Sequence, residues 1–132
     1  MIALDTNCLL RLLTNDLPEQ AQQVMKRLEK CERNGTAVFL AVPVLVETVG
    51  NLSWRRYRFS REQIADVVER LLNTPVFAID QRDAVAAALH DYRKGWGDFT
   101  DHLIRRIADL AGATPLVTFD GDLLNHAGFT AP

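Results

Sequence analysis

Acidic side chains stand at several places where an apolar run stops or where a helix is expected to begin. Asp5 follows the apolar residues 1–4, and Asp120 follows the largely apolar run 115–119 near the other end of the chain. Glu47 is the one acid among residues 42–49, and Asp98 and Asp101 stand where a helix should start, with Asp122 a possible sixth member. Carboxylates are oxygen ligands for hard divalent cations, so this set suits metal-assisted hydrolysis.

Each of these acids also has a purely structural explanation. Asp5 and Asp98 suit helix N-caps, Asp101 suits a first helical turn, and Asp120 before a glycine suits a turn. Capping does not predict acids after both the first and the last strand, however. Carboxylates gathered in one crevice would raise one another's pKa values, and a divalent cation removes that conflict.

Nitrogen and sulfur ligands are not arranged for a metal in this sequence. The three histidines form no HExxH or His-x₃-His pair, and we expect all of them, including His102, at the surface. Cys8 and Cys31 fall in helical apolar patterns and are expected to be small buried thiols rather than a disulfide. Oxygen ligands alone favour Mg²⁺ or Mn²⁺ over zinc.

The elements that must position the acids alternate along the chain. Apolar runs predict strands at 1–4, 36–42, 76–79 and 116–119. Helical periodicity predicts helices at 8–13 and 19–33. Start signals predict four further helices: one opened by Pro43, one after the capping box at Ser60, one capped by Asp80 and one that starts at Asp98. Strands that alternate with helices indicate an α/β fold with a mainly parallel sheet. In such sheets ligands bind at the carboxyl ends of the strands, so acids from opposite ends of the sequence are expected to meet.

Length and composition indicate one ordinary globular domain spanning residues 1–132. Hydrophobic residues make up 48% of the chain. The net charge is −2, so the overall charge of the chain does not indicate nucleic-acid binding. Met1 leads directly into the first expected strand, so we expect no signal peptide. No apolar run approaches the ~18–20 residues of a membrane span, and a soluble cytoplasmic protein is expected.

The ordered motifs resemble a known family. Asp5-Thr6-Asn7 after a short strand, Glu47 in the third helix, Asp98-Phe99-Thr100-Asp101 opening a helix, and Thr118-Phe119-Asp120 after the last strand resemble the PIN domain. The closest likeness is to the VapC toxins of toxin–antitoxin pairs. His102 departs from the pattern, because these toxins commonly carry a small residue after the third acid.

The resemblance implies a three-layer α/β/α fold with a central, mainly parallel sheet. It also implies a Mg²⁺- or Mn²⁺-dependent endoribonuclease in which water attacks in line and leaves a 5′-phosphate. Asp5, Glu47, Asp101 and Asp120 would be the catalytic carboxylates and metal ligands, and Asp98 an auxiliary ligand. Thr6, Asn7 and Thr118 would orient them. The implied partners are an RNA substrate, a VapB-like antitoxin and a second copy of the chain in a homodimer.

Three other features have open interpretations. Residues 54–61 hold four arginines among three aromatic residues, which suits contact with single-stranded RNA, a protein interface, or a solvated connection whose rings pack on the core. Arg11 could contact phosphate or form a surface ion pair. Trp96, between two glycines, could be a lip of the site or an anchor in the core.

Other functions compete with a toxin nuclease. The chain could be an RNA-processing nuclease of the same family, or a non-catalytic module that binds RNA or protein; an antitoxin gene directly upstream would favour the toxin. Receiver domains need a lysine at a late strand end, and no lysine stands there. Phosphatases of the haloacid dehalogenase type carry Asp-x-Asp after the first strand, whereas the pair Asp120 and Asp122 lies near the carboxyl terminus.

Overall fold

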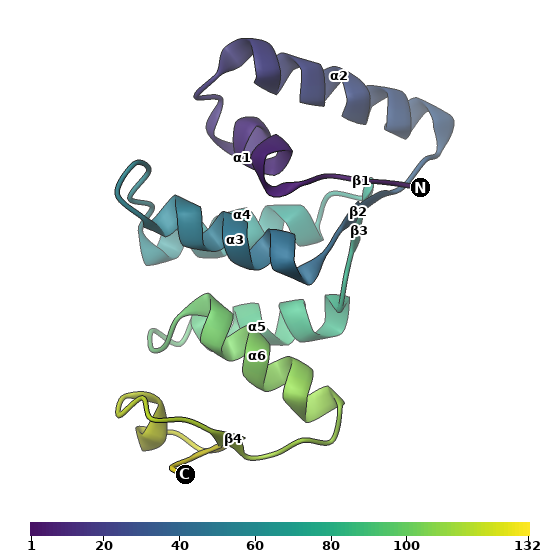
Figure 1. Cartoon of the computed structure of the whole chain (residues 1–132). Coiled ribbons are helices and arrows are strands. Elements are labelled where there is room, and N and C mark those ends of the chain that lie inside the picture. The colour runs from purple at the N-terminus through teal and green to yellow at the C-terminus, as the bar shows by residue number, and fades with distance from the viewer. The chain divides into compact units, whose positions relative to one another are not determined.

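A computed structural model describes all 132 residues of the chain. The chain divides into two compact units, Met1–Arg82 and Asp83–Pro132, each of which is described by itself (Figure 1). The elements of the first unit are β1 (Ile2–Ala3), α1 (Thr6–Thr14), α2 (Pro18–Asn34), β2 (Val38–Leu40), α3 (Val42–Ser53), α4 (Arg61–Leu72) and β3 (Phe77–Ile79). Those of the second are α5 (Arg82–Tyr92), which begins at the boundary, α6 (Phe99–Leu110), β4 (Leu116–Val117), the 3₁₀ turn η1 (Leu123–Asn125) and β5 (Phe129–Thr130).

The amino-terminal unit is built on a three-stranded parallel sheet in the order β1-β2-β3 (Figure 1). Ile2 lies beside Val38, and Val38 lies beside Phe77, so the three strands run in the same direction. Each crossover carries two helices, which is the connection that parallel strands require. The parallel strands and the α/β class expected from the sequence are therefore confirmed.

Local sequence explains most of the helix boundaries in this unit. Asp5 caps α1, so this helix begins two residues earlier than expected. Pro18 opens α2, and Gly35, with a φ of 65°, closes it in the left-handed conformation. The Ser60 capping box is confirmed at the start of α4, where Ser60 Oγ accepts from the Gln63 N–H and the Gln63 side chain accepts in return.

Asp80 has a different role from the one expected. Its Oδ2 accepts a hydrogen bond from the Val42 backbone N–H at 3.2 Å, so it caps the start of α3 rather than the helix that follows it. The first N–H groups of a helix lack intrahelical partners, and Ala41 at the N-cap of α3 offers no side-chain acceptor. Asp80 meets this need because it follows β3, which is paired with β2 directly before α3.

The carboxy-terminal unit contains two helices and a second, two-stranded sheet. β4 and β5 pair in parallel, with Leu116 beside Phe129. The sequence did not predict β5, which is only two residues long. Phe99 and Leu103 of α6 are buried, and so is His102, which has no exposed surface; the expectation that His102 lies at the surface is wrong.

Both cysteines are free thiols; Cys31 is buried, and Cys8 is partly exposed. None of the helices combines the length and the apolar character that crossing a membrane demands.

Candidate functional site

Asp5 is held at the carboxyl end of β1 by the first turn of α1. Its Oδ1 accepts from the Cys8 backbone N–H at 2.9 Å, which makes it the N-cap of the helix. Hydrogen bonds from Cys8, and a weaker one from the Asn7 backbone, hold the pKa of Asp5 below its ordinary value despite the opposing effect of burial. The carboxylate is exposed, so it stays ionised and accessible to a cation.

Glu47 lies on α3 and meets the residue that follows Asp5. The Thr6 hydroxyl donates a hydrogen bond to Glu47 Oε2 at 3.2 Å, across 41 positions of sequence. α1 packs against α3, and this packing brings the two ends of the contact together. The Glu47 and Asn7 side chains are exposed, so the amino-terminal unit presents two carboxylates beside Thr6 and Asn7.

Asp98 and Asp101 lie at the start of α6 in the carboxy-terminal unit. The Asp98 backbone N–H donates to Asp101 Oδ2 at 3.3 Å, so Asp101 closes the first turn onto the N-cap residue. Burial raises the pKa of Asp101, the Asp98 N–H opposes this effect, and the charges of Asp98 and Asp120 raise the pKa further; the net pKa is above the ordinary value. These three carboxylates therefore interact electrostatically within one unit.

Asp120 follows β4 in a turn that fixes its direction. The Thr118 hydroxyl accepts from the Asp120 backbone N–H at 3.0 Å. Asp120 Oδ1 in turn accepts from the backbone N–H groups of Asp122 and Leu123, at 2.9 and 3.4 Å. Thr118 thus orients the residue proposed as a ligand, whereas Asp122 acts here through its backbone.

The four candidate catalytic carboxylates share one arrangement. In each of them, at least one oxygen accepts a hydrogen bond from the chain. No three His, Cys, Asp or Glu side chains lie close enough together to hold a metal ion. Within the units, the acids fall into a pair, Asp5 and Glu47, and a group of Asp98, Asp101 and Asp120.

Two aromatic residues near Asp98 have structural contacts that the sequence did not reveal. His102 Nε2 lies 2.7 Å from the Trp96 carbonyl oxygen, which requires the proton on Nε2. The Trp96 ring stacks on His126, with ring centroids 3.6 Å apart and an angle of 5° between the planes. Trp96 is half-buried, and these contacts place it as an anchor of the loop that leads to Asp98.

The segment 54–61 and Arg11 both converge on Asp16 of the α1–α2 connection. The Tyr57 hydroxyl donates to Asp16 Oδ2 at 2.6 Å, and Arg56 and Arg11 form ion pairs with Asp16 at 3.1 and 3.3 Å. Arg11 is therefore an ion-pair partner in this structure. Trp54 remains 65% exposed, with the Arg55 guanidinium over its ring.

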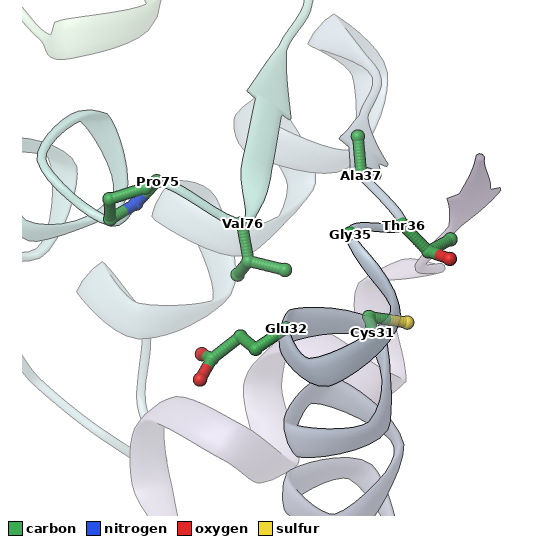
Figure 2. Close-up of a pocket in the computed structure, with 7 residues that line it drawn as sticks. All are labelled: Cys31, Glu32, Gly35, Thr36, Ala37, Pro75 and Val76. Atoms are coloured by element: carbon green, nitrogen blue, oxygen red, sulfur yellow. The ribbon is translucent and has the colours of Figure 1, made fainter.

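A cavity of about 500 Å³ lies away from the acids of the amino-terminal unit. Figure 2 shows Cys31 and Glu32 on the last turn of α2, Gly35 to Ala37 on the connection to β2, and Pro75 and Val76 before β3. It lies at the amino ends of β2 and β3, whereas Asp5 follows the carboxyl end of β1. The cavity is therefore separate from the candidate carboxylates.

A buried acid that the sequence did not single out lies in the carboxy-terminal unit. Asp91 has a side chain only 3% exposed and accepts two hydrogen bonds from Arg106, at 2.6 and 2.9 Å. Burial tends to raise its pKa, but the Arg106 hydrogen bonds and the charges of Arg106 and Lys94 outweigh burial and lower it. Nothing in its neighbourhood in the sequence predicted this burial.

Comparison with known proteins covers nearly the whole chain. Residues 2–129 match a family model described as PIN domain. The chain is 30% identical over 129 residues to a VapC ribonuclease of Aquifex aeolicus (strain VF5), covering 98% of this chain and 93% of that protein. No solved structure gave a significant match. The matched regions include all the candidate carboxylates.

Proposed function

Because the chain belongs to the PIN domain family, we propose that it is a metal-dependent endoribonuclease that acts as the toxin of a toxin–antitoxin pair. The similarity to a VapC ribonuclease supports RNA as the substrate class. The proposal includes a VapB-like antitoxin as the partner that restrains the enzyme, and a homodimer as the assembled form.

The arrangement of the carboxylate oxygens carries this proposal. We assign Asp5, Glu47, Asp101 and Asp120 as the catalytic residues, because a hydrogen bond from the chain orients each of these carboxylates. Orientation by a supporting hydrogen bond is how ligands of a metal are commonly prepared.

The donor set fits Mg²⁺ or Mn²⁺. The proposed ligands Asp5, Glu47, Asp98, Asp101 and Asp120 offer oxygen atoms only, which hard cations prefer. The raised pKa of Asp101, caused by burial and by the charges of Asp98 and Asp120, indicates a group whose negative charge lacks compensation. A bound cation would lower the pKa of a water molecule attached to it and stabilise negative charge on the phosphoryl oxygens.

The chain's own residues prepare the carboxylates for this task. The Thr6 hydroxyl orients Glu47, and the hydroxyl of Thr118 fixes the backbone at Asp120. The Asp98 N–H holds Asp101. Asp98 is assigned as an auxiliary ligand and Asn7 as a polar neighbour of Asp5.

Cleavage of total RNA by the purified chain tests the nuclease. We expect discrete cuts with Mg²⁺ or Mn²⁺ and none with EDTA, and we expect Asp101→Asn to abolish them. Asp83→Asn is the matched control, because Asp83 is an exposed acid in the first turn of another helix, α5. If a folded wild-type chain does not cut, or if Asp101→Asn cuts as the wild type does, the nuclease assignment is wrong and a non-catalytic binding module takes its place.

Growth of bacteria that express the chain tests the toxin role separately. We expect induction to arrest growth, co-expression of the protein encoded directly upstream to relieve the arrest, and the Asp101→Asn variant to be harmless. Metal-dependent cleavage without arrest of growth would identify an RNA-processing nuclease instead.

A further inference from the structure

A pocket rich in basic side chains lies within the carboxy-terminal unit. It has a volume of about 340 Å³, which is in the size range of small-ligand pockets. Its lining includes Lys94, Arg105, Arg106, Trp96 and His126, together with the buried Asp91. None of these residues belongs to the candidate catalytic set.

Positive charge exceeds negative charge in this pocket. Arg106 satisfies both oxygens of Asp91 through two hydrogen bonds. The Lys94 ammonium lies 3.6 Å and an Arg105 nitrogen 3.7 Å from the same carboxylate, so three cations share one buried anion. Asp109 compensates only in part, at 3.8 Å from Arg105 and 3.9 Å from Arg106.

Arg105 has donors that no protein acceptor uses. Its Nε is buried without a hydrogen-bond partner, and its two ion pairs are longer than hydrogen bonds. A buried N–H without a partner is costly, so an additional acceptor would stabilise this arrangement. The exposed ammonium of Lys94 offers a second donor group from the same pocket. A phosphate offers acceptor oxygens and additional negative charge to Lys94 and Arg105, which share the Asp91 carboxylate with Arg106.

The pocket lies next to a proposed catalytic acid on the same helix. Arg105 is four residues after Asp101 on α6, so the two side chains lie one turn apart on the same helix face, about 6 Å along the axis. The stacked rings of Trp96 and His126 form an aromatic wall beside the cations. Aromatic rings with arginine and lysine are the combination that holds single-stranded RNA.

We propose that this pocket binds a phosphate group of the RNA substrate adjacent to the scissile bond, through Lys94 and Arg105. The proposal rests on the proposed ribonuclease function and adds to it a substrate-positioning site outside the carboxylates. Arg106 neutralises Asp91, and this neutralisation leaves the other two cations available to the substrate.

Binding of a short fluorescein-labelled oligouridine in EDTA tests the pocket without cleavage. Lys94→Gln keeps the fold, because the Lys94 side chain is 55% exposed; Lys26→Gln, an exposed lysine of α2, is the matched control. We expect Lys94→Gln to weaken binding about three- to fivefold, which corresponds to the upper end of the free energies found for one exposed charge pair. The slope of log K against log salt should fall by about 0.7, the loss of one phosphate contact on a single strand. Lys26→Gln should change neither quantity.

Two further measurements locate the contact. In a Trp54→Phe background Trp96 is the sole tryptophan, and oligouridine should change its fluorescence. With Mg²⁺ present, Lys94→Gln and Arg105→Gln should raise KM and leave kcat nearly unchanged, because the contact positions the substrate.

The outcomes separate this proposal from the nuclease assignment. Suppose that the chain cleaves RNA with metal, but that Lys94→Gln and Arg105→Gln show the same KM and the same salt slope as the Lys26→Gln control. That result overturns the pocket while the nuclease stands. RNA binding that depends on Lys94 in a chain that never cleaves supports an RNA phosphate site in this pocket, but it overturns the nuclease and with it the position beside a scissile bond. A fluorescence change with polyglutamate but not with oligouridine assigns the pocket to an acidic protein and overturns the proposal.

Discussion

Replacing Asp91 by asparagine removes the buried charge on which three cations of the carboxy-terminal unit converge. The change keeps the shape of the side chain but replaces one acceptor oxygen with an amide. It therefore weakens the two Arg106 hydrogen bonds and leaves Lys94 and Arg105 facing a neutral group. Breaking a fully buried ion pair costs about 3–5 kcal/mol.

Partial hydration of the cations lowers this figure. The Arg106 side chain is 31% exposed and the Lys94 side chain 55% exposed, so both regain some water once Asp91 is neutral. We expect the variant to lose about 2–3 kcal/mol of unfolding free energy at pH 7, the range for hydrogen bonds to charged groups. For a chain of this size the melting temperature should fall by roughly 6–15 °C.

Urea unfolding followed by circular dichroism measures the loss, and Asp109→Asn is the control. Asp109 is more exposed, and its ion pairs are 3.8 and 3.9 Å long, so its replacement should cost less than about 1 kcal/mol. The pKa of Asp91 is lowered in the folded chain, so its contribution is fully present above the ordinary value of 3.8 and is lost as the pH falls through the folded pKa. Equal losses of stability in the two variants at pH 7, or an Asp91→Asn deficit that persists in strong acid, would refute the assigned role of the Asp91 charge.

Three other substitutions test separate parts of the structure. Burial and neighbouring carboxylates raise the pKa of Asp101, so the charge of Asp101 opposes folding at neutral pH. In EDTA at pH 7, Asp101→Asn should therefore raise the free energy of unfolding measured in urea, and this gain should vanish in acid. Tyr57→Phe removes the hydrogen bond that contributes most to the low pKa of Asp16, so a carboxyl NMR titration should show that pKa rising; an unchanged value would contradict the assigned contact. Gly97→Ala should cost about 1–3 kcal/mol in thermal unfolding, because φ is 66° and the added carbon would lie 3.0 Å from a buried imidazole, whereas Gly50→Ala, in open space within α3, should not destabilise the chain.

Patterns local to the sequence determined the elements. Apolar runs and helical periodicity predicted the alternation of strands and helices, and the family match over residues 2–129 confirms the expected α/β/α class. Capping residues act within a few positions, so the Ser60 box was predictable. The candidate carboxylates could also be identified from the sequence, because they stand at the ends of predicted strands and in or near the starts of predicted helices. Their catalytic roles stay a prediction.

Tertiary structure decided which partner each polar side chain has. Asp80 was expected to cap the next helix, but strand pairing carries it to Val42, 38 residues away. Asp91 and His102 lie in polar-looking stretches and are nonetheless buried, since Arg106 neutralises the acid and the Trp96 carbonyl accepts from the imidazole. Capping and periodicity depend on neighbours along the chain and can be read from sequence. Burial and long-range pairing depend on distances through space, which exist only once the helices and strands have packed.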